Sequence, residues 1–232
     1  MREIVLDTET TGLDPTQGHR IVEIGAVELW NQMPTGKTYH QYINPQRSMP
    51  EEAFAVHGLS EAFLSDKPIF EKIAQEFLDF VQDSKMVIHN ASFDMRFLNH
   101  ELSNLNLRTL PNDQAIDTLM IARRKFPGAS VSLDSLCRRF NIDNSMRTLH
   151  GALLDSEILA EIYLELTGGR QPDFELGQSI TPLKNDGQAQ NQGRVQIIRP
   201  RALTSRLTQE EKDAHNAFVK TLGDEALWKT YQ

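Results

Sequence analysis

Cysteine and long apolar runs are almost absent from this chain of 232 residues. The single cysteine, Cys137, excludes a framework of internal disulfide bonds. No stretch approaches the run of about 18 apolar residues that a membrane-spanning helix needs, so we expect no membrane partner. Residues 1–3 lead directly into an apolar run, which leaves no room there for a signal peptide. These absences favour a cytoplasmic protein.

An excess of positive charge is also lacking. The chain has 24 Lys and Arg residues against 32 Asp and Glu residues, which gives a formal net charge of −8. Broad, nonspecific binding to a polyanion depends on many Lys and Arg contacts to phosphates, so the balance argues against it. A nucleic acid would have to be held locally, through metal ions at its end or by a second protein.

Two acids follow the apolar run Ile4-Val5-Leu6, which predicts a buried first strand. Because strand side chains alternate between faces, Asp7 and Glu9 are expected on the same face of the sheet. Two neighbouring carboxylates that lose hydration repel each other unless a proton or a cation lies between them. A divalent cation is the more productive solution, and an acidic pair facing water is the alternative at this stage.

Two further acids have similar surroundings. Asp94 follows a second apolar strand and falls in the first turn of a predicted helix, where the helix dipole alone could favour it. Asp155 lies in a later helix, on the same stripe as Ala152, Leu159 and Ile162. An isolated carboxylate on a stripe that faces the core must be partnered or must bind a metal ion.

Three motifs in this order resemble those of the DEDDh 3′ to 5′ exonucleases: Asp7-x-Glu9, Asn90-x-x-x-Asp94, and His150 followed five residues later by Asp155. The resemblance spans about residues 2–168. Within this family the sequence is most similar to the proofreading subunits of bacterial DNA polymerase III, through I-V-L-D-T-E-T-T-G, E-A-F-A-V-H-G and a C-terminal extension. The resemblance implies an α/β, ribonuclease H-like fold with a five-stranded mixed sheet flanked by helices.

The resemblance also implies a metal site. It makes Asp7, Glu9, Asp94 and Asp155 the ligands of two divalent ions. Four carboxylates without a cysteine cluster suit hard cations, so Mg²⁺ or Mn²⁺ is expected rather than zinc. His150 is then the general base, because a neutral imidazole near pH 7 can take a proton from an attacking water. The alternative for His150 is a histidine at a helix start that bonds to the backbone.

Substrate binding is carried over from the same family. Glu52 and His57 match residues that contact the terminal nucleotide, and Asp7, Glu9 and Asp155 are expected to contact it as well. The expected partner is therefore a DNA 3′ end, single-stranded or frayed. Spacing alone does not show this, since His57 followed by a glycine is also typical of a turn that ends a helix.

Hydrophobic periodicity predicts the remaining elements. Strands are expected at about 3–9, 21–30 and 37–44 with a turn at 31–36, then a helix after Pro68, a strand at 86–90, a helix at 93–105, a short strand near 115–117, and helices near 118–126, 132–140 and 151–167. Strands mixed with alternating helices indicate an α/β layer fold.

Composition divides the chain into an exonuclease domain at 1–168, a flexible polar linker at 169–194 and a partner-binding segment at 195–232. Thr208 and Glu211 form a predicted capping box at the start of a helix. About 20 residues of helix cannot form a core alone, so the segment docks on another protein or packs back on the nuclease domain. The resemblance implies docking on the polymerase catalytic subunit, and other holoenzyme subunits are further candidates.

The sequence therefore predicts a metal-dependent 3′ to 5′ exodeoxyribonuclease that works within a DNA-directed DNA polymerase holoenzyme. It removes mispaired 3′ nucleotides by two-metal-ion hydrolysis of phosphodiester bonds. One alternative is a DEDDh exonuclease that trims RNA, since the same site can cleave either sugar. A second is a noncatalytic subunit that only stabilises its polymerase, and the intact acidic set speaks against it.

Overall fold

A mixed five-stranded sheet with the order β3-β2-β1-β4-β5 lies at the centre of the first of two units, Met1–Gly177 and Gln178–Gln232, into which the chain divides. The computed structural model describes residues 1–147, 149–168 and 208–221. The strands are β1 (Arg2–Thr10), β2 (Ile21–Trp30), β3 (Met33–Tyr42), β4 (Lys85–Ile88) and β5 (Ala115–Asp117). β1, β2 and β3 pair antiparallel, whereas β1, β4 and β5 pair parallel, so the predicted fold class is confirmed.

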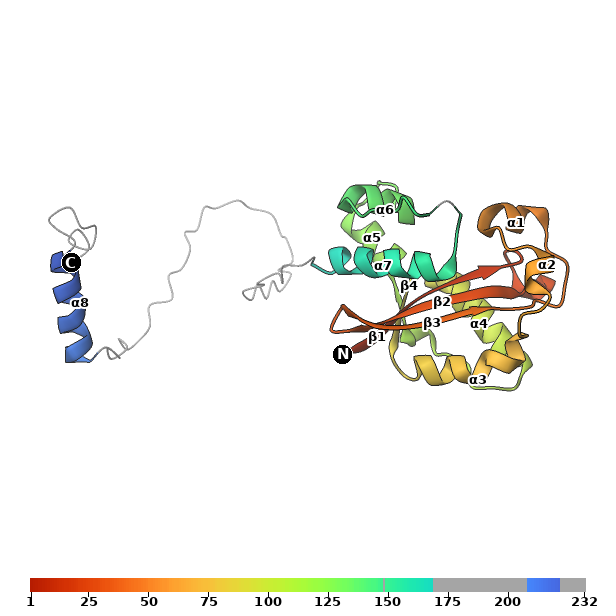
Figure 1. Cartoon of the computed structure of the whole chain (residues 1–232), viewed down its shortest axis with the longest axis horizontal. Coiled ribbons are helices and arrows are strands. Elements are labelled where there is room, and N and C mark those ends of the chain that lie inside the picture. The colour runs from red at the N-terminus through yellow and green to blue at the C-terminus, as the bar shows by residue number, and fades with distance from the viewer. Residues whose placement is uncertain (148, 169–207, 222–232) are drawn as a thin grey trace, which may run out of the picture. The chain divides into compact units, whose positions relative to one another are not determined.

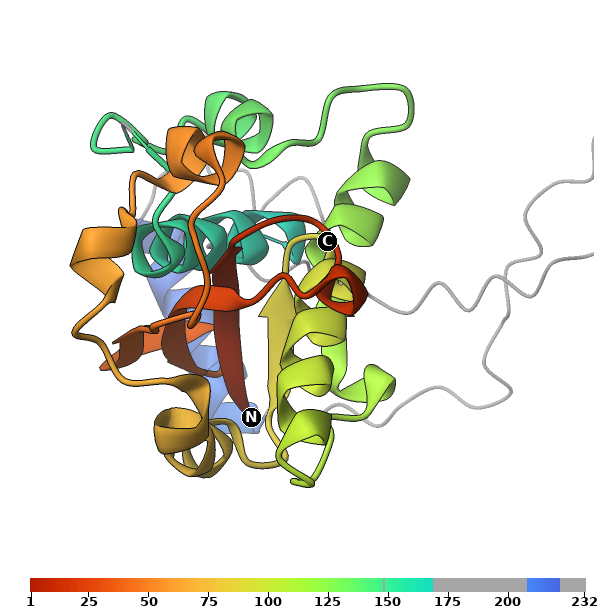
Figure 2. The same cartoon turned by 90° about the vertical axis from the view of Figure 1, so that its right-hand side faces the viewer.

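Helices cover both faces of this sheet (Figures 1 and 2). Ile4 and Leu6 pack with α3 (Phe70–Val81) and α4 (Ala91–Asn104) on one face. Val5 belongs to the core on the other face, with α5 (Thr118–Lys125), α6 (Leu133–Phe140) and α7 (Ala152–Leu166). Because both faces are buried, consecutive residues of β1 are apolar, and period-2 alternation is absent there.

A glycine brings α7 directly onto the sheet. A Cβ atom at Gly25 of β2 would lie 2.1 Å from the Leu153 nitrogen and 2.2 Å from the Ala152 carbonyl carbon. The Ser156 hydroxyl donates a hydrogen bond of 2.9 Å to the Gly25 carbonyl. Since Gly25 pairs with Asp7 across the sheet, the first turn of α7 is held next to the acidic end of β1.

The sheet differs from the prediction at two places. The predicted turn at 31–36 is wrong, because β3 begins at Met33 and only Asn31 and Gln32, both with positive φ, connect it to β2. Pro34 lies within β3, which is an edge strand, where a missing N–H is tolerated. The predicted strand 86–90 ends early at Ile88, and Asn90 precedes α4 in the left-handed conformation.

Two short helices were not predicted: α1 (Glu51–His57) and α2 (Glu61–Leu64). Phe54 and Val56 of α1 are exposed, so the segment has no apolar stripe from which a helix could be inferred. Gly58 ends α1 in the left-handed conformation, with a φ of 72°. The helix-ending turn that the His57-Gly58 pair suggested is therefore present.

The second unit contains α8 (Gln209–Thr221). Its predicted capping box is confirmed, because the Thr208 N–H donates to the Glu211 carboxylate at 2.8 Å and the Glu211 N–H donates to the Thr208 hydroxyl at 3.3 Å. The predicted linker at 169–194 and most of the segment 195–232 lie outside the described residues. Among the residues that are described, no helix is long and apolar enough to cross a membrane.

Candidate active site

Four carboxylates come from three elements that meet at the end of β1. Asp7 and Glu9 lie on the same face of that strand, Asp94 lies in the first turn of α4, and Asp155 lies in the first turn of α7. The Thr8 hydroxyl donates a hydrogen bond of 2.7 Å to Asp94 Oδ1, which fixes Asp94 beside β1. Asp94 and Asp155 are buried, with exposed fractions of 3% and 4%.

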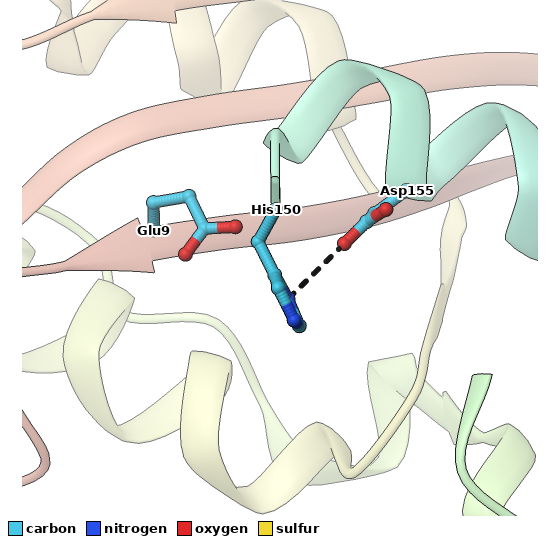
Figure 3. A group of neighbouring side chains, drawn as sticks. All are labelled: Glu9, His150 and Asp155. Atoms are coloured by element: carbon cyan, nitrogen blue, oxygen red, sulfur yellow. Dashed lines mark ion pairs between the residues drawn. The ribbon is translucent and has the colours of Figure 1, made fainter. Parts of the chain in front are cut away.

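His150 completes this group just ahead of α7. Its Nδ1 lies 3.5 Å from Asp155 Oδ2, and potential ligand atoms of Glu9, His150 and Asp155 all lie within 4.8 Å of one another (Figure 3). The His150 N–H donates to the Val56 carbonyl at 3.1 Å, which ties the backbone, but not the ring, to α1. Burial and the adjacent Arg147 guanidinium lower the pKa of His150, so the ring is neutral at pH 7.

Three carboxylates of this site, Asp7, Glu9 and Asp94, resist ionisation. Burial, together with Asp94 and Glu9, raises the pKa of Asp7 well above its usual range. Burial and the Glu23 carboxylate raise the pKa of Glu9 to about 8. Burial also raises the pKa of Asp94 to about 7, although hydrogen bonds from Thr8 oppose that effect. Several neighbouring acids with raised pKa values mark a functional site rather than a solvated acidic pair.

Cations would relieve this repulsion, and the residues fit a divalent ion. The donors are carboxylate oxygens and one imidazole nitrogen, with no thiolate among them. Oxygen-rich sets of this kind suit Mg²⁺ and Mn²⁺. A bound dication also favours the charged form of each carboxylate, which removes the energetic cost that burial imposes. The structure thus brings together the four predicted metal ligands and the predicted base, which are Asp7, Glu9, Asp94, Asp155 and His150.

Arg147 is the site residue that sequence analysis missed. Its Nε and Nη2 donate to Asp155 Oδ1 and Oδ2 at 2.5 and 2.8 Å, and its Nη1 donates to Asp134 Oδ1 at 3.0 Å. The guanidinium is almost fully buried, with 8% of the side chain exposed. Arg147 lies three residues before His150 in the sequence, which is the one feature that could have indicated it. Because a loop has no regular periodicity, the direction of its side chains cannot be predicted.

A cavity of about 540 Å³ opens on one side of β1. Its walls include Glu9, Glu52, His57 and Phe93. His57 Nδ1 accepts a hydrogen bond of 3.1 Å from the Leu59 N–H, so the ring proton lies on Nε2. Among the described residues, buried Nε2 has no hydrogen-bond partner. Such an orphan donor in a cavity wall is a candidate ligand contact.

A second cavity, of about 330 Å³, is lined by Asp7, Asp134, Arg147, His150 and Asp155 among others. β1 therefore contributes Glu9 to the wall of the first cavity and Asp7 to the wall of the second. A larger cavity, of about 640 Å³, lies along α4 and is lined by none of the predicted site residues. The predicted site residues thus line the two cavities at the end of β1 and not the cavity along α4.

A family model described as an exonuclease matches residues 4–163, which contain every element of this site. A protein of Rickettsia prowazekii, the DNA polymerase III subunit epsilon, is 53% identical over 222 residues, which cover 94% of this chain and 96% of its own. The protein of the same name from Escherichia coli K12 is 44% identical over 245 residues, covering 98% and 97%. This chain belongs to the epsilon family of exonucleases.

Solved structures of exonucleases share the fold of this epsilon-family chain. Exonuclease X in complex with 5′ overhanging duplex DNA aligns with a TM-score of 0.56 at 28% identity, covering 71% of this chain and 90% of that one. The nuclease domain of 3′hExo, a DEDDh family member bound to rAMP, aligns with a TM-score of 0.60 and the same coverage. At 18% identity the second likeness shows the fold alone. The predicted family and the ribonuclease H-like fold are confirmed.

The raised carboxylate pKa values give a first prediction. Glu9 has an ordinary pKa of 4.5 and a folded-state value of about 8, so its burial costs nothing below pH 4.5 and weakens folding progressively as the pH rises from 4.5 to about 8. In EDTA, the melting temperature of this epsilon-family protein should fall by about 5 °C between pH 5 and pH 8. Differential scanning calorimetry measures this, and Mg²⁺ should reduce the fall. A melting temperature that rises over the same range contradicts the raised pKa values.

Proposed function

We propose that this protein is a metal-dependent 3′ to 5′ DNA exonuclease that removes mispaired 3′ nucleotides within DNA polymerase III. One observation carries the proposal: buried carboxylates and a neutral histidine meet beside a cavity of about 540 Å³, in a chain of the epsilon family. A proofreading nuclease needs both a pocket for a frayed terminal nucleotide and a hydrolytic centre next to it. Its cellular location in this proposal is the cytoplasm.

The metal ions in this proposal are Mg²⁺ or Mn²⁺, two per site, held by Asp7, Glu9, Asp94 and Asp155. Once bound, such ions lower the pKa of a coordinated water and stabilise the charge that develops on the leaving 3′ oxygen. The carboxylates of this chain fix where the scissile phosphate lies, because three different elements hold them rigidly around the end of β1. Preorganised ligands of this kind need no rearrangement during the reaction.

His150 is the general base. Its lowered pKa keeps an imidazole nitrogen free to accept a proton at neutral pH. The hydrogen bond from its N–H to Val56 fixes the backbone, and Asp155 at 3.5 Å can stabilise the imidazolium after the proton has moved. The ring is about half exposed, so it can pass the proton on to solvent.

The cavity of about 540 Å³ binds the terminal nucleotide in this proposal. His57 offers its unpaired Nε2–H as a donor, and the Glu52 carboxylate offers an acceptor on the same wall. Asp7, Glu9 and Asp155 complete the proposed substrate-binding set, since the ions that they would hold would supply positive charge for the terminal phosphate. Binding of the terminal nucleotide in this way uses few cationic side chains, in agreement with the negative net charge of the chain.

The C-terminal segment, 195–232, binds the polymerase catalytic subunit in this proposal, with other holoenzyme subunits as further partners. Phe218 of α8 is 60% exposed, and an amphipathic helix of this length needs a partner surface to be stable. Truncation after Gly168 should leave nuclease activity intact and abolish copurification with the polymerase subunit. A truncated protein that fails to fold would show that the C-terminal segment is needed for the fold of the nuclease domain, which contradicts the proposal.

The deciding experiment is degradation of a 3′-mismatched primer-template in Mg²⁺ by the full-length protein. The same DNA with a blocked 3′ end and a matched RNA strand are the controls. Stepwise release from the free 3′ DNA end supports the proposal. Faster release from RNA supports the RNA-trimming alternative, and no release from either strand supports a noncatalytic role.

Replacing His150 by alanine gives the second prediction. The nuclease rate at pH 7 should fall by about 100-fold or more, because the proton acceptor is lost, while Mn²⁺ affinity stays within about twofold of the original. Single-turnover kinetics and Mn²⁺ titration measure the two quantities. His100→Ala, on α4 away from the carboxylates, is the matched control and should change neither. Equal losses of rate and metal affinity would make His150 a ligand instead.

A further inference from the structure

Arg147 holds both oxygens of a proposed metal ligand. The guanidinium forms a two-pronged contact with Asp155, at 2.5 and 2.8 Å, which is the strongest geometry available to an arginine and a carboxylate. Its Nη2 also lies 2.9 Å from His150 Nδ1. One buried cation therefore contacts a proposed ligand and the proposed base at the same time.

A divalent ion and this guanidinium compete for the same carboxylate. Potential ligand atoms of Glu9 and Asp155 lie within 4.8 Å of each other, so an ion shared by these two carboxylates would lie next to the Arg147 guanidinium. Two positive groups this close repel each other strongly in a buried site. Both also use the lone pairs of the Asp155 oxygens. The Arg147 guanidinium therefore opposes full binding of the ion by Asp155 as long as it stays in place.

Asp134 offers Arg147 a second partner outside the proposed ligand set. Its Oδ1 accepts from Arg147 Nη1 at 3.0 Å and from the Asn144 amide at 3.0 Å, which holds the carboxylate in place on α6. The Asp134 side chain is 47% exposed, so it is well hydrated when Arg147 is elsewhere. Arg147 can thus leave Asp155 without becoming an unpaired buried cation, which would be costly.

We propose that Arg147 is a competing internal cation that neutralises Asp155 until a divalent ion displaces it toward Asp134. The inference rests on the proposed role of Asp155 as a metal ligand. It assigns Arg147 the role of a positioning residue and makes Asp134 the carboxylate that receives the displaced guanidinium. The exchange lowers the metal affinity of the site, since the ion must break a two-pronged contact before it binds.

The rival role for Arg147 is a permanent partner that orients Asp155 for the ion. The two roles predict opposite changes in metal affinity when Arg147 is removed. If Arg147 orients the ligand, its removal weakens metal binding. If Arg147 competes with the ion, its removal strengthens metal binding, while loss of Asp134 weakens it because the guanidinium then has no second partner.

The test is Mn²⁺ titration of the full-length protein, with free Mn²⁺ measured by electron paramagnetic resonance. For Arg147→Gln, the half-saturating Mn²⁺ concentration should fall by about tenfold, as expected for loss of a charge-assisted contact. For Asp134→Asn it should rise by about threefold. Arg138→Gln removes the same charge from the same region, where Arg138 contacts Ser135, and should leave the concentration unchanged.

Melting temperatures separate this result from a folding defect. In EDTA, Arg147→Gln should melt below the wild type, because buried Asp155 loses its partner, and saturating Mn²⁺ should close the gap. If Arg147→Gln does not fold, Arg147→Lys keeps the charge without the fork and should show a smaller fall in half-saturating concentration. Unchanged or weaker Mn²⁺ binding by the folded arginine variant overturns the proposal. Undiminished binding by Asp155→Asn instead overturns the ligand assignment.

Discussion

Asp7→Asn is expected to abolish nuclease activity while making the protein more stable in EDTA. The rate should fall by at least about 1,000-fold, because the variant loses a charged ligand that Asn cannot replace. The melting temperature at pH 8 should rise by about 2–4 °C. Burial and the Asp94 and Glu9 carboxylates raise the pKa of Asp7, so the charged form of Asp7 weakens the fold. Removing it relieves that repulsion.

The stability gain should depend on pH. As the pH falls toward the ordinary pKa of Asp, 3.8, the Asp7 carboxyl becomes neutral in the unfolded chain as well as in the folded protein, and the advantage of the variant disappears. Asp113→Asn is the matched control, because Asp113 is exposed and outside the site, and it should alter neither activity nor melting temperature. Retained activity in Asp7→Asn would refute the ligand role. Lost activity with a lower melting temperature would make Asp7 a structural residue.

The proposed ligands could be predicted from sequence because each depends on a local rule. Strand periodicity places Asp7 and Glu9 on one face, and helical periodicity turns Asp155 toward the core. The apolar residues around these acids identify the strand and the helix, so both periodicities can be applied from the sequence. Asp94 required the family resemblance as well, since a first-turn acid is common at helix starts.

The remaining features depend on contacts between distant segments. Nothing near Arg147 in the sequence indicates that its fork meets Asp155, because the loop that carries it has no periodicity. The β2–β3 turn was misplaced because Pro34 and Gly36 are typical of turns, whereas an edge strand tolerates them. α1 was missed because the helix is short and its apolar residues, such as Phe54, stay exposed. Surroundings in the folded protein, rather than local composition, decide these cases.

Gly25 is another feature that depends on contacts between distant segments, and its replacement is expected to impair both the fold and the site. A Cβ atom at Gly25 would meet backbone atoms of Ala152 and Leu153 at 2.1 to 2.4 Å, and backbone cannot rotate away as a flexible side chain can. α7 must therefore move off the sheet. Gly25→Ala should lower the free energy of unfolding by about 2–4 kcal/mol, the range expected for severe overpacking.

The same displacement should impair the chemistry beyond the loss of stability. Asp155 and His150 move with the start of α7, whereas Asp7 stays in β1, so the carboxylates no longer meet with the original geometry. A misplacement of about 1 Å can cost about 100-fold in rate, and Gly25→Ala should show at least that loss at a temperature where it is fully folded. Urea unfolding and nuclease assays measure the two effects.

Gly36→Ala provides the comparison that separates backbone strain from helix displacement. Gly36 has a φ of +85°, and an added Cβ would meet nothing within 4 Å, so its replacement costs only the strain of the left-handed conformation, about 1 kcal/mol. Its nuclease rate should equal that of the wild type. If Gly25→Ala keeps full activity despite lower stability, α7 need not touch the sheet for Asp155 to reach the site. If its Mn²⁺ affinity falls together with its rate, the contact at Gly25 is what assembles the ligands.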